Sequence, residues 1–123
     1  MFQVDYMSRT PIYEQITEQI ERFIASGILK PGDQLPSVRS LSAEISVNPN
    51  TIQKAYGELD AKGMLTSVPG RGCFVSSGAF AVIHDDGIKK LPQLTKMVEE
   101  LIAAGVNREE IENAVSAAFG KKG

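Results

Sequence analysis

The side chains best suited to read base edges gather in one short stretch near the middle of the chain. These residues are Asn48, Asn50, Thr51, Gln53 and Lys54. Asn and Gln can each make two hydrogen bonds to adenine, and Thr can contact a thymine methyl group or a phosphate. We therefore expect this group to contact DNA. Asn48 is also a good helix cap, and capping could be its sole role.

Two smaller groups of residues flank this stretch. Ser37 and Arg39 precede it, and both can reach a phosphate if the start of their helix lies against a DNA backbone. Gly70 and Arg71 follow it; Gly70 and Gly72 permit a tight turn and close approach to a duplex, and Arg71 suits a phosphate or the minor groove. The alternatives are a solvated arginine at 39 and a plain hairpin turn at 70–72.

Capping residues and apolar spacing predict the elements that carry these side chains. Ser37 and Asn48 are expected N-caps of two short helices, which a tight turn at Ser46-Val47 separates. The buried stripe of the second helix is predicted to be Ile52, Ala55, Tyr56 and Leu59. Strands are expected over 64–68 and 73–76. Helix, turn, helix and hairpin in this order form a winged helix-turn-helix, which offers a helix to the major groove.

An earlier helix should support this unit. Thr10-Pro11 predicts its start, with Thr10 as the N-cap, and Gly27 predicts its end. Its apolar face is expected to comprise Ile12, Ile16, Ile20, Phe23 and Ile24. Lys30 to Asp33 places proline and glycine where a type II turn needs them, and a very short strand is expected over 33–35.

The last third of the chain shows a different pattern. Residues 80–87 are a short apolar run followed by His84-Asp85-Asp86-Gly87, which we interpret as a solvated linker rather than a metal site. Two amphipathic helices should follow, separated by Gly105, and Asn107 to Glu110 is a capping box at the start of the second. The final residues 120–123 are expected to fray.

These two helices are too small to build a core alone, so their apolar side chains need a partner surface. A second copy of the chain is the favoured partner, and packing on the chain's own winged helix is the alternative. The predicted dimerisation residues are Leu91, Leu94, Val98, Leu101, Ile102, Ile111 and Val115. The expected domains are therefore a winged helix-turn-helix over 1–77 and a helical dimerisation tail over 78–123.

Composition narrows the classes of function. The chain has 123 residues, one histidine, one cysteine and a net charge of −2. We expect no enzyme, cofactor or metal site, and Cys73 is interpreted as a structural thiol. No stretch reaches the roughly 18 apolar residues of a membrane span, and the N-terminus does not resemble a signal peptide, so a cytoplasmic location is expected. The acidic balance means that DNA binding must depend on cations placed on one face.

Several of these segments together resemble the GntR family of bacterial transcription regulators, and specifically its YtrA-type branch. The segments are Pro11 to Ile16, Leu29 to Arg39, Val47 to Tyr56 and Gly70 to Val75. The resemblance implies an N-terminal winged helix that binds an operator as a homodimer, followed by a short helical tail that mainly dimerises. It carries the family's DNA contacts onto Arg39, Asn48, Asn50, Thr51, Gln53, Gly70 and Arg71.

The sequence thus predicts a mainly α protein with a small β-hairpin, in which a winged helix-turn-helix precedes a two-helix tail. The predicted function is a sequence-specific DNA-binding transcription regulator, a repressor, that binds an inverted-repeat operator as a homodimer. One alternative is a sensor of an unidentified small-molecule effector, with its pocket where the tail meets the winged helix. Another is a winged helix that binds proteins, for which the acidic net charge is the best argument.

Overall fold

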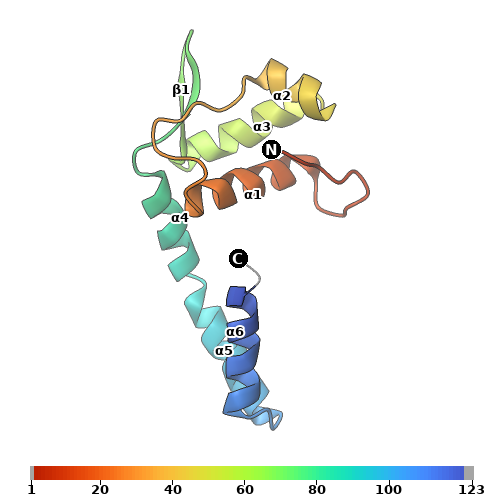
Figure 1. Cartoon of the computed structure of the whole chain (residues 1–123), viewed down its shortest axis with the longest axis vertical. Helices are drawn as coiled ribbons and strands as arrows, with labels where there is room; N and C mark the ends of the chain where they lie inside the picture. The colour runs from red at the N-terminus through yellow and green to blue at the C-terminus, as the bar shows by residue number, and fades with distance from the viewer. Residues whose placement is uncertain (1, 121–123) are drawn as a thin grey trace. The chain divides into compact units, whose positions relative to one another are not determined.

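A computed structural model describes residues 2–120 of the chain (Figure 1). The chain divides into two compact units, Met1–Asp86 and Gly87–Gly123. The sequence placed this boundary at 77/78. The difference arises because helix α4 (Ala79–Ile88) begins in the first unit: Ala79 is fully buried, and Val82 and Ile83 pack against the same core.

Helix α1 (Ile12–Ala25) contributes buried apolar residues to the core of the first unit. Its apolar residues recur at helical spacing, and Ile16, Ile20 and Ile24 are buried. The expected N-cap Thr10 is wrong, because the cap position is Pro11 and no side chain caps this helix. The helix ends as predicted at Gly27, whose φ of +83° lies in the left-handed region that favours glycine.

Helices α2 (Val38–Ile45) and α3 (Pro49–Ala61) form the helix-turn-helix. Both predicted caps are confirmed: Ser37 Oγ accepts the Ser40 N–H at 3.0 Å, and Asn48 Oδ1 accepts the Asn50 N–H at 2.8 Å. The predicted inner stripe of α3 is also confirmed, because Ile52, Ala55, Tyr56 and Leu59 are all buried. Helix α3 packs against both α1 and α2, which fixes its outer face.

Strands β1 (Leu65–Val68) and β2 (Gly72–Val75) form the antiparallel hairpin that we call the wing, with Leu65 opposite Val75. Each strand lies within one residue of its predicted bounds. The predicted type II turn is confirmed, since Asp33 N–H donates to Lys30 O at 2.9 Å and Gly32 has a φ of +88°. It leads into the expected short strand, of which Gln34 forms an isolated bridge with Phe74.

The second unit contains helices α5 (Leu91–Ala103) and α6 (Arg108–Gly120), joined by a turn at Gly105. The predicted capping box is confirmed: Asn107 N–H donates to Glu110 Oε1 at 3.1 Å, and Glu110 N–H donates to Asn107 Oδ1 at 2.9 Å. Of the predicted frayed end, Gly120 closes α6, and 121–123 lie outside the described residues.

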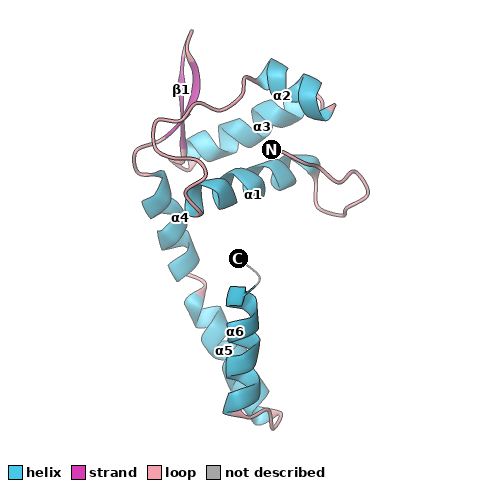
Figure 2. Ribbon diagram, viewed as in Figure 1, coloured by secondary structure: helices cyan, strands magenta, loops and turns pink. Residues whose placement is uncertain are grey.

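The predicted fold class, mainly α with a small β-hairpin, is confirmed (Figure 2). The structure also contains one helix that was not predicted. Residues 80–87, interpreted from sequence as a linker, lie within helix α4 (Ala79–Ile88). Within it the imidazole of His84 stacks on the Phe80 ring, with the ring centroids 6.0 Å apart, and its Nδ1 lies 3.7 Å from Asp85 Oδ1. The solvent exposure expected for His84 and Asp85 is observed.

Candidate nucleic-acid interface

The turn between α2 and α3 is tightly fixed. Ser46 adopts a left-handed conformation with a φ of +55°, and Val47 inserts into the core with only 6% of its surface exposed. Ser42 Oγ donates to Val47 O at 2.6 Å, and Val47 N–H donates to Ser42 O at 3.2 Å. The orientation of α3 relative to α2 is therefore set by the core and by these hydrogen bonds.

The start of α3 presents amide side chains to solvent. Asn48, Asn50 and Gln53 are exposed, whereas Thr51 is half-buried. The cap uses only the side-chain oxygen of Asn48, so its amide NH₂ group keeps its capacity to donate to a ligand. Capping and base contact are thus compatible at this residue. The positive end of the α3 dipole adds attraction for a phosphate.

Unlike the other predicted DNA-contacting residues of α3, Lys54 contacts a side chain of another helix. Its Nζ sits 3.8 Å from the centroid of the Tyr13 ring, in the first turn of α1. This is a cation–π contact, which at an exposed site contributes on the order of 0.5–1 kcal/mol. In this structure Lys54 therefore holds α3 against the start of α1, and it must leave the ring to reach a phosphate.

Ser37 and Arg39 lie at the start of α2, and both are exposed. Arg39 has no ion pair with any residue in the range 2–120. Its guanidinium is therefore available to a phosphate, for which its planar set of donors is well suited.

The tip of the wing is held by Gln34, a residue that no sequence pattern singled out. Gln34 Nε2 donates to Arg71 O at 3.0 Å, across 37 residues of chain, while Arg71 N–H donates to Val68 O at 2.9 Å. Gly70 and Gly72 have φ values of +77° and +125°. The Arg71 side chain is exposed. The wing thus presents Arg71 on a backbone fixed from two sides.

A cavity of about 240 Å³ is lined by residues of α2, α3 and the wing. Three of the residues around it are Ser37, Gln53 and Gly72; Asn48, Asn50, Arg39 and Arg71 lie outside its lining. Tyr56 and Cys73 also line it, and the Tyr56 hydroxyl donates to Pro36 O at 2.7 Å. Burial raises the pKa of both the Tyr56 hydroxyl and the Cys73 thiol, so both stay neutral at physiological pH.

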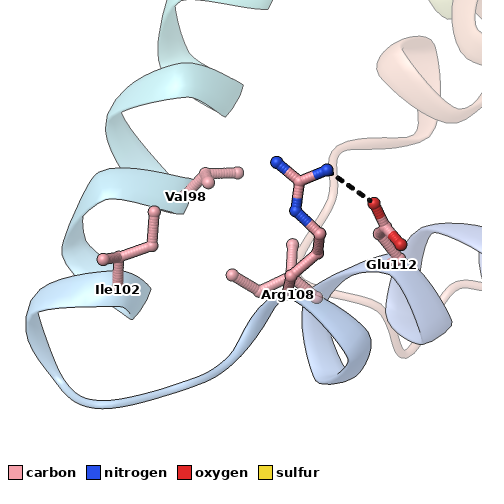
Figure 3. A pocket seen from close by; sticks show the side chains of 5 residues that line it. Val98, Ile102, Arg108 and Glu112 are labelled. Carbon is pink, nitrogen blue, oxygen red and sulfur yellow. Dashed lines mark ion pairs between the residues drawn. The ribbon is translucent and has the colours of Figure 1, made fainter.

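The residues predicted to dimerise lie on α5 and α6, and none of them is buried within the chain. Val98, Leu101 and Ile111 are half-buried, whereas Leu91, Leu94, Ile102 and Val115 are exposed. Val98 and Ile102 line a second cavity of about 240 Å³ together with residues of α6 (Figure 3). At its edge Arg108 Nη1 lies 3.6 Å from Glu112 Oε2.

No group of three or more His, Cys, Asp or Glu side chains positioned for a metal ion occurs in the part of the chain that the structure describes. Across the same residues, no helix combines the length and apolar character that a membrane span requires.

This arrangement defines a winged helix-turn-helix regulator of the kind that binds DNA. The model of the bacterial regulatory proteins of the gntR family matches residues 12–75, which include α1, α2, α3 and the wing. The chain belongs to the GntR family, and is therefore a transcriptional regulator rather than an enzyme.

Individual relatives support this assignment. The HTH-type transcriptional repressor YtrA of Bacillus subtilis (strain 168) is 41% identical over 112 residues, which cover 90% of this chain and 86% of the relative. The crystal structure of a transcriptional regulator from Oenococcus oeni is 33% identical with a TM-score of 0.74, covering 94% of this chain and 97% of that one.

A third relative was solved with its nucleic acid. The structure of AraR(DBD) in complex with operator ORX1 is 32% identical with a TM-score of 0.56, and the match covers 62% of this chain and 96% of that one. DNA binding by this fold is therefore supported at the level of the winged helix.

Proposed function

We propose that this protein is a sequence-specific DNA-binding repressor that acts as a homodimer on an inverted-repeat operator. The observation that carries the proposal is the exposed amide-rich start of α3, which follows a rigid turn in a winged helix-turn-helix. Asn48, Asn50 and Gln53 there have the chemistry to read bases in a major groove. The repressor role is supported by the YtrA relative, which is named as a repressor.

Backbone contacts are assigned to the cations around this helix. Arg39 at the start of α2 and Arg71 at the tip of the wing are both exposed and can approach phosphates on either side of the groove. Ser37 and Gly70 support them through a hydroxyl donor and a small turn residue. Thr51 contributes from its half-buried position, and Lys54 contributes if it leaves Tyr13.

Dimerisation is assigned to the helical tail, because α5 and α6 bury none of their residues within the chain. Large apolar side chains are half or more exposed at Leu91, Leu94 and Ile102, with exposed fractions of 50%, 50% and 61%. A second copy that covered them would remove this apolar surface from water. Two α3 helices could then enter successive major grooves about one helical turn apart. Such a regulator acts where the chromosome is, in the cytoplasm.

The test is fluorescence anisotropy on duplexes from the DNA upstream of the protein's own gene, measured over a salt series. We expect saturable binding of two chains per site, tighter than on scrambled DNA and weakening steeply with salt. Binding that shows no sequence preference and hardly responds to salt would contradict the proposal and favour the protein-binding module.

The double variant Arg39→Ala/Arg71→Ala tests the assigned face. A dimer would lose four cations, and each phosphate contact contributes about 0.9 to the slope of log K against log salt, so the slope should fall by about 3.6. At 0.1 M salt the affinity should fall by about 4,000-fold. Lys62→Ala is the matched control, because Lys62 is an exposed cation at the opposite end of α3. A folded double variant with the parent's affinity would overturn the assignment.

A further inference from the structure

The segment that precedes α1 is ordered by contacts along that helix. Phe2 is buried, and its ring packs edge-on against Phe23 with the centroids 5.7 Å apart. Gln19 exchanges hydrogen bonds with the backbone of Gln3, and Gln3 N–H donates to Gln19 Oε1 at 3.1 Å. The segment is therefore a fixed part of the first unit.

Residues 5–10, which we call the arm, form a loop that Gln15 closes. Asp5 N–H donates to Gln15 Oε1 at 2.8 Å, and Gln15 Nε2 donates to Asp5 O at 2.9 Å and to Thr10 O at 2.8 Å. Inside the loop, Met7 N–H donates to Asp5 Oδ1 at 2.9 Å and Thr10 N–H donates to Ser8 Oγ at 3.1 Å. One glutamine thus fixes both ends of the arm.

The arm is also attached to the helix-turn-helix. The Tyr6 hydroxyl lies 2.8 Å from Ile45 O and 2.6 Å from Ser46 O, and shares its proton between these two carbonyls at the end of α2. Seven residues later, the Tyr13 ring lies under Lys54 of α3. Arg9 falls between these two attachments, three residues from Tyr6, a span of at most about 10 Å.

The chemistry of the arm suits a phosphate. Arg9 is exposed and forms no ion pair with another residue that the structure describes. The first unit carries seven Lys and Arg against ten Asp and Glu, so its overall charge does not attract DNA and each well-placed cation matters. Lys54, the cation nearest the start of α3 in sequence, is already engaged by Tyr13.

We propose that the arm is a third DNA-contacting element beside α3 and the wing, in which Tyr6 holds the loop on the helix-turn-helix and Arg9 binds a backbone phosphate. This inference rests on the proposed function. It assigns to Arg9 a contact that positions the protein on the duplex without reading sequence. It assigns to Tyr6 a positioning role, because its hydroxyl acts through the loop.

The experiment measures the affinity of the full chain for its operator duplex over a salt series, for the parent and for Arg9→Ala. A dimer loses two cations in this variant, so the salt slope should fall by about 1.8 and the affinity at 0.1 M salt by about 60-fold, equally for specific and scrambled duplexes. Lys62→Ala removes the same charge at the far end of α3 and should leave both quantities at the parent's values.

Tyr6→Phe keeps the ring and removes only the hydroxyl. It should lower affinity in the parent, and it should have little further effect in the Arg9→Ala background, because both changes remove the same contact. An equal loss in both backgrounds would show that Tyr6 acts on the α2–α3 turn alone, which would overturn its positioning role.

The outcomes separate this inference from the proposed function. If the parent binds its operator and Arg39→Ala/Arg71→Ala lowers both slope and affinity as predicted while Arg9→Ala changes neither, the arm proposal fails and the regulator stands. If the parent binds no duplex at low salt, the regulator proposal fails and the arm proposal fails with it.

Discussion

Replacing Gly72 by alanine tests how the wing is fixed. Gly72 begins β2 with a φ of +125°, a conformation that side-chain-bearing residues rarely adopt. A Cβ at this position would lie 2.7 Å from Gln34 Nε2, the group that donates to Arg71 O. The substitution therefore perturbs both the backbone of the wing and the hydrogen bond that holds its tip.

The expected loss of stability in Gly72→Ala is the sum of the backbone strain and the lost hydrogen bond. An L side chain in this backbone region costs on the order of 1–3 kcal/mol. Because Gln34 is exposed and flexible, its amide can move aside, so the steric contact costs little more than the lost hydrogen bond, about 1 kcal/mol. We expect Gly72→Ala to lower the free energy of unfolding by about 2–4 kcal/mol in total.

Urea unfolding followed by circular dichroism measures this change. Gly57→Ala is the matched control: Gly57 lies within α3, and a Cβ there would meet no atom within 4 Å, so alanine should stabilise the helix by up to about 1 kcal/mol. In a Gln34→Ala background the hydrogen bond is already absent, and Gly72→Ala should cost only the backbone strain.

Two results would refute this reasoning. One is a Gly72→Ala variant as stable as the parent, which would mean that the wing adopts another backbone. The other is an identical cost in the parent and in Gln34→Ala, which would mean that Gln34 does not hold the tip.

Three further predictions concern other parts of the chain. Asn48→Ala should cost about 1 kcal/mol of stability through the lost cap on Asn50 N–H, measured by urea unfolding, and should also weaken operator binding. Asn48→Ser keeps a capping oxygen but loses the amide NH₂ group, so it should keep the stability and still weaken binding; unchanged binding in Asn48→Ser would reduce Asn48 to a cap. The double variant Leu94→Glu/Ile102→Glu places charges on the exposed apolar side chains of α5 and should convert a dimer to a monomer in analytical ultracentrifugation. The thermal unfolding of the first unit should be unchanged. A variant that stays dimeric would contradict the tail assignment. Burial raises the pKa of the Cys73 thiol, so at pH 8 its thiolate is scarcer in the folded protein than in the unfolded chain. The Cys73 thiol should therefore react more slowly with a disulfide reagent in buffer than in urea. Equal rates would show an exposed thiol.

Sequence alone determined the elements whose causes are local. The caps at Ser37 and Asn48, the turn at 30–33 and the capping box at 107–110 each depend on residues within four positions, and all were predicted. Helix α4 escaped prediction because its inward residues Ala79, Val82 and Ile83 cover barely one turn, too short for a periodic pattern. Thr10 was misassigned as a cap because the helix begins one residue later, where the carbonyl of Pro11 accepts the first helical N–H bonds, from Glu14 and Gln15.

The positions of side chains at the candidate interface were decided only by the tertiary structure. Gln34 meets Arg71 across 37 residues, Tyr6 meets Ser46 across 40, and Lys54 faces Tyr13 from another helix. Such contacts follow from packing α1 and α2 on α3 around one core, and a polar side chain at the surface carries no local pattern that names its partner. The sequence therefore determined which residues could bind DNA, and the packed core determined which of them are free to do so.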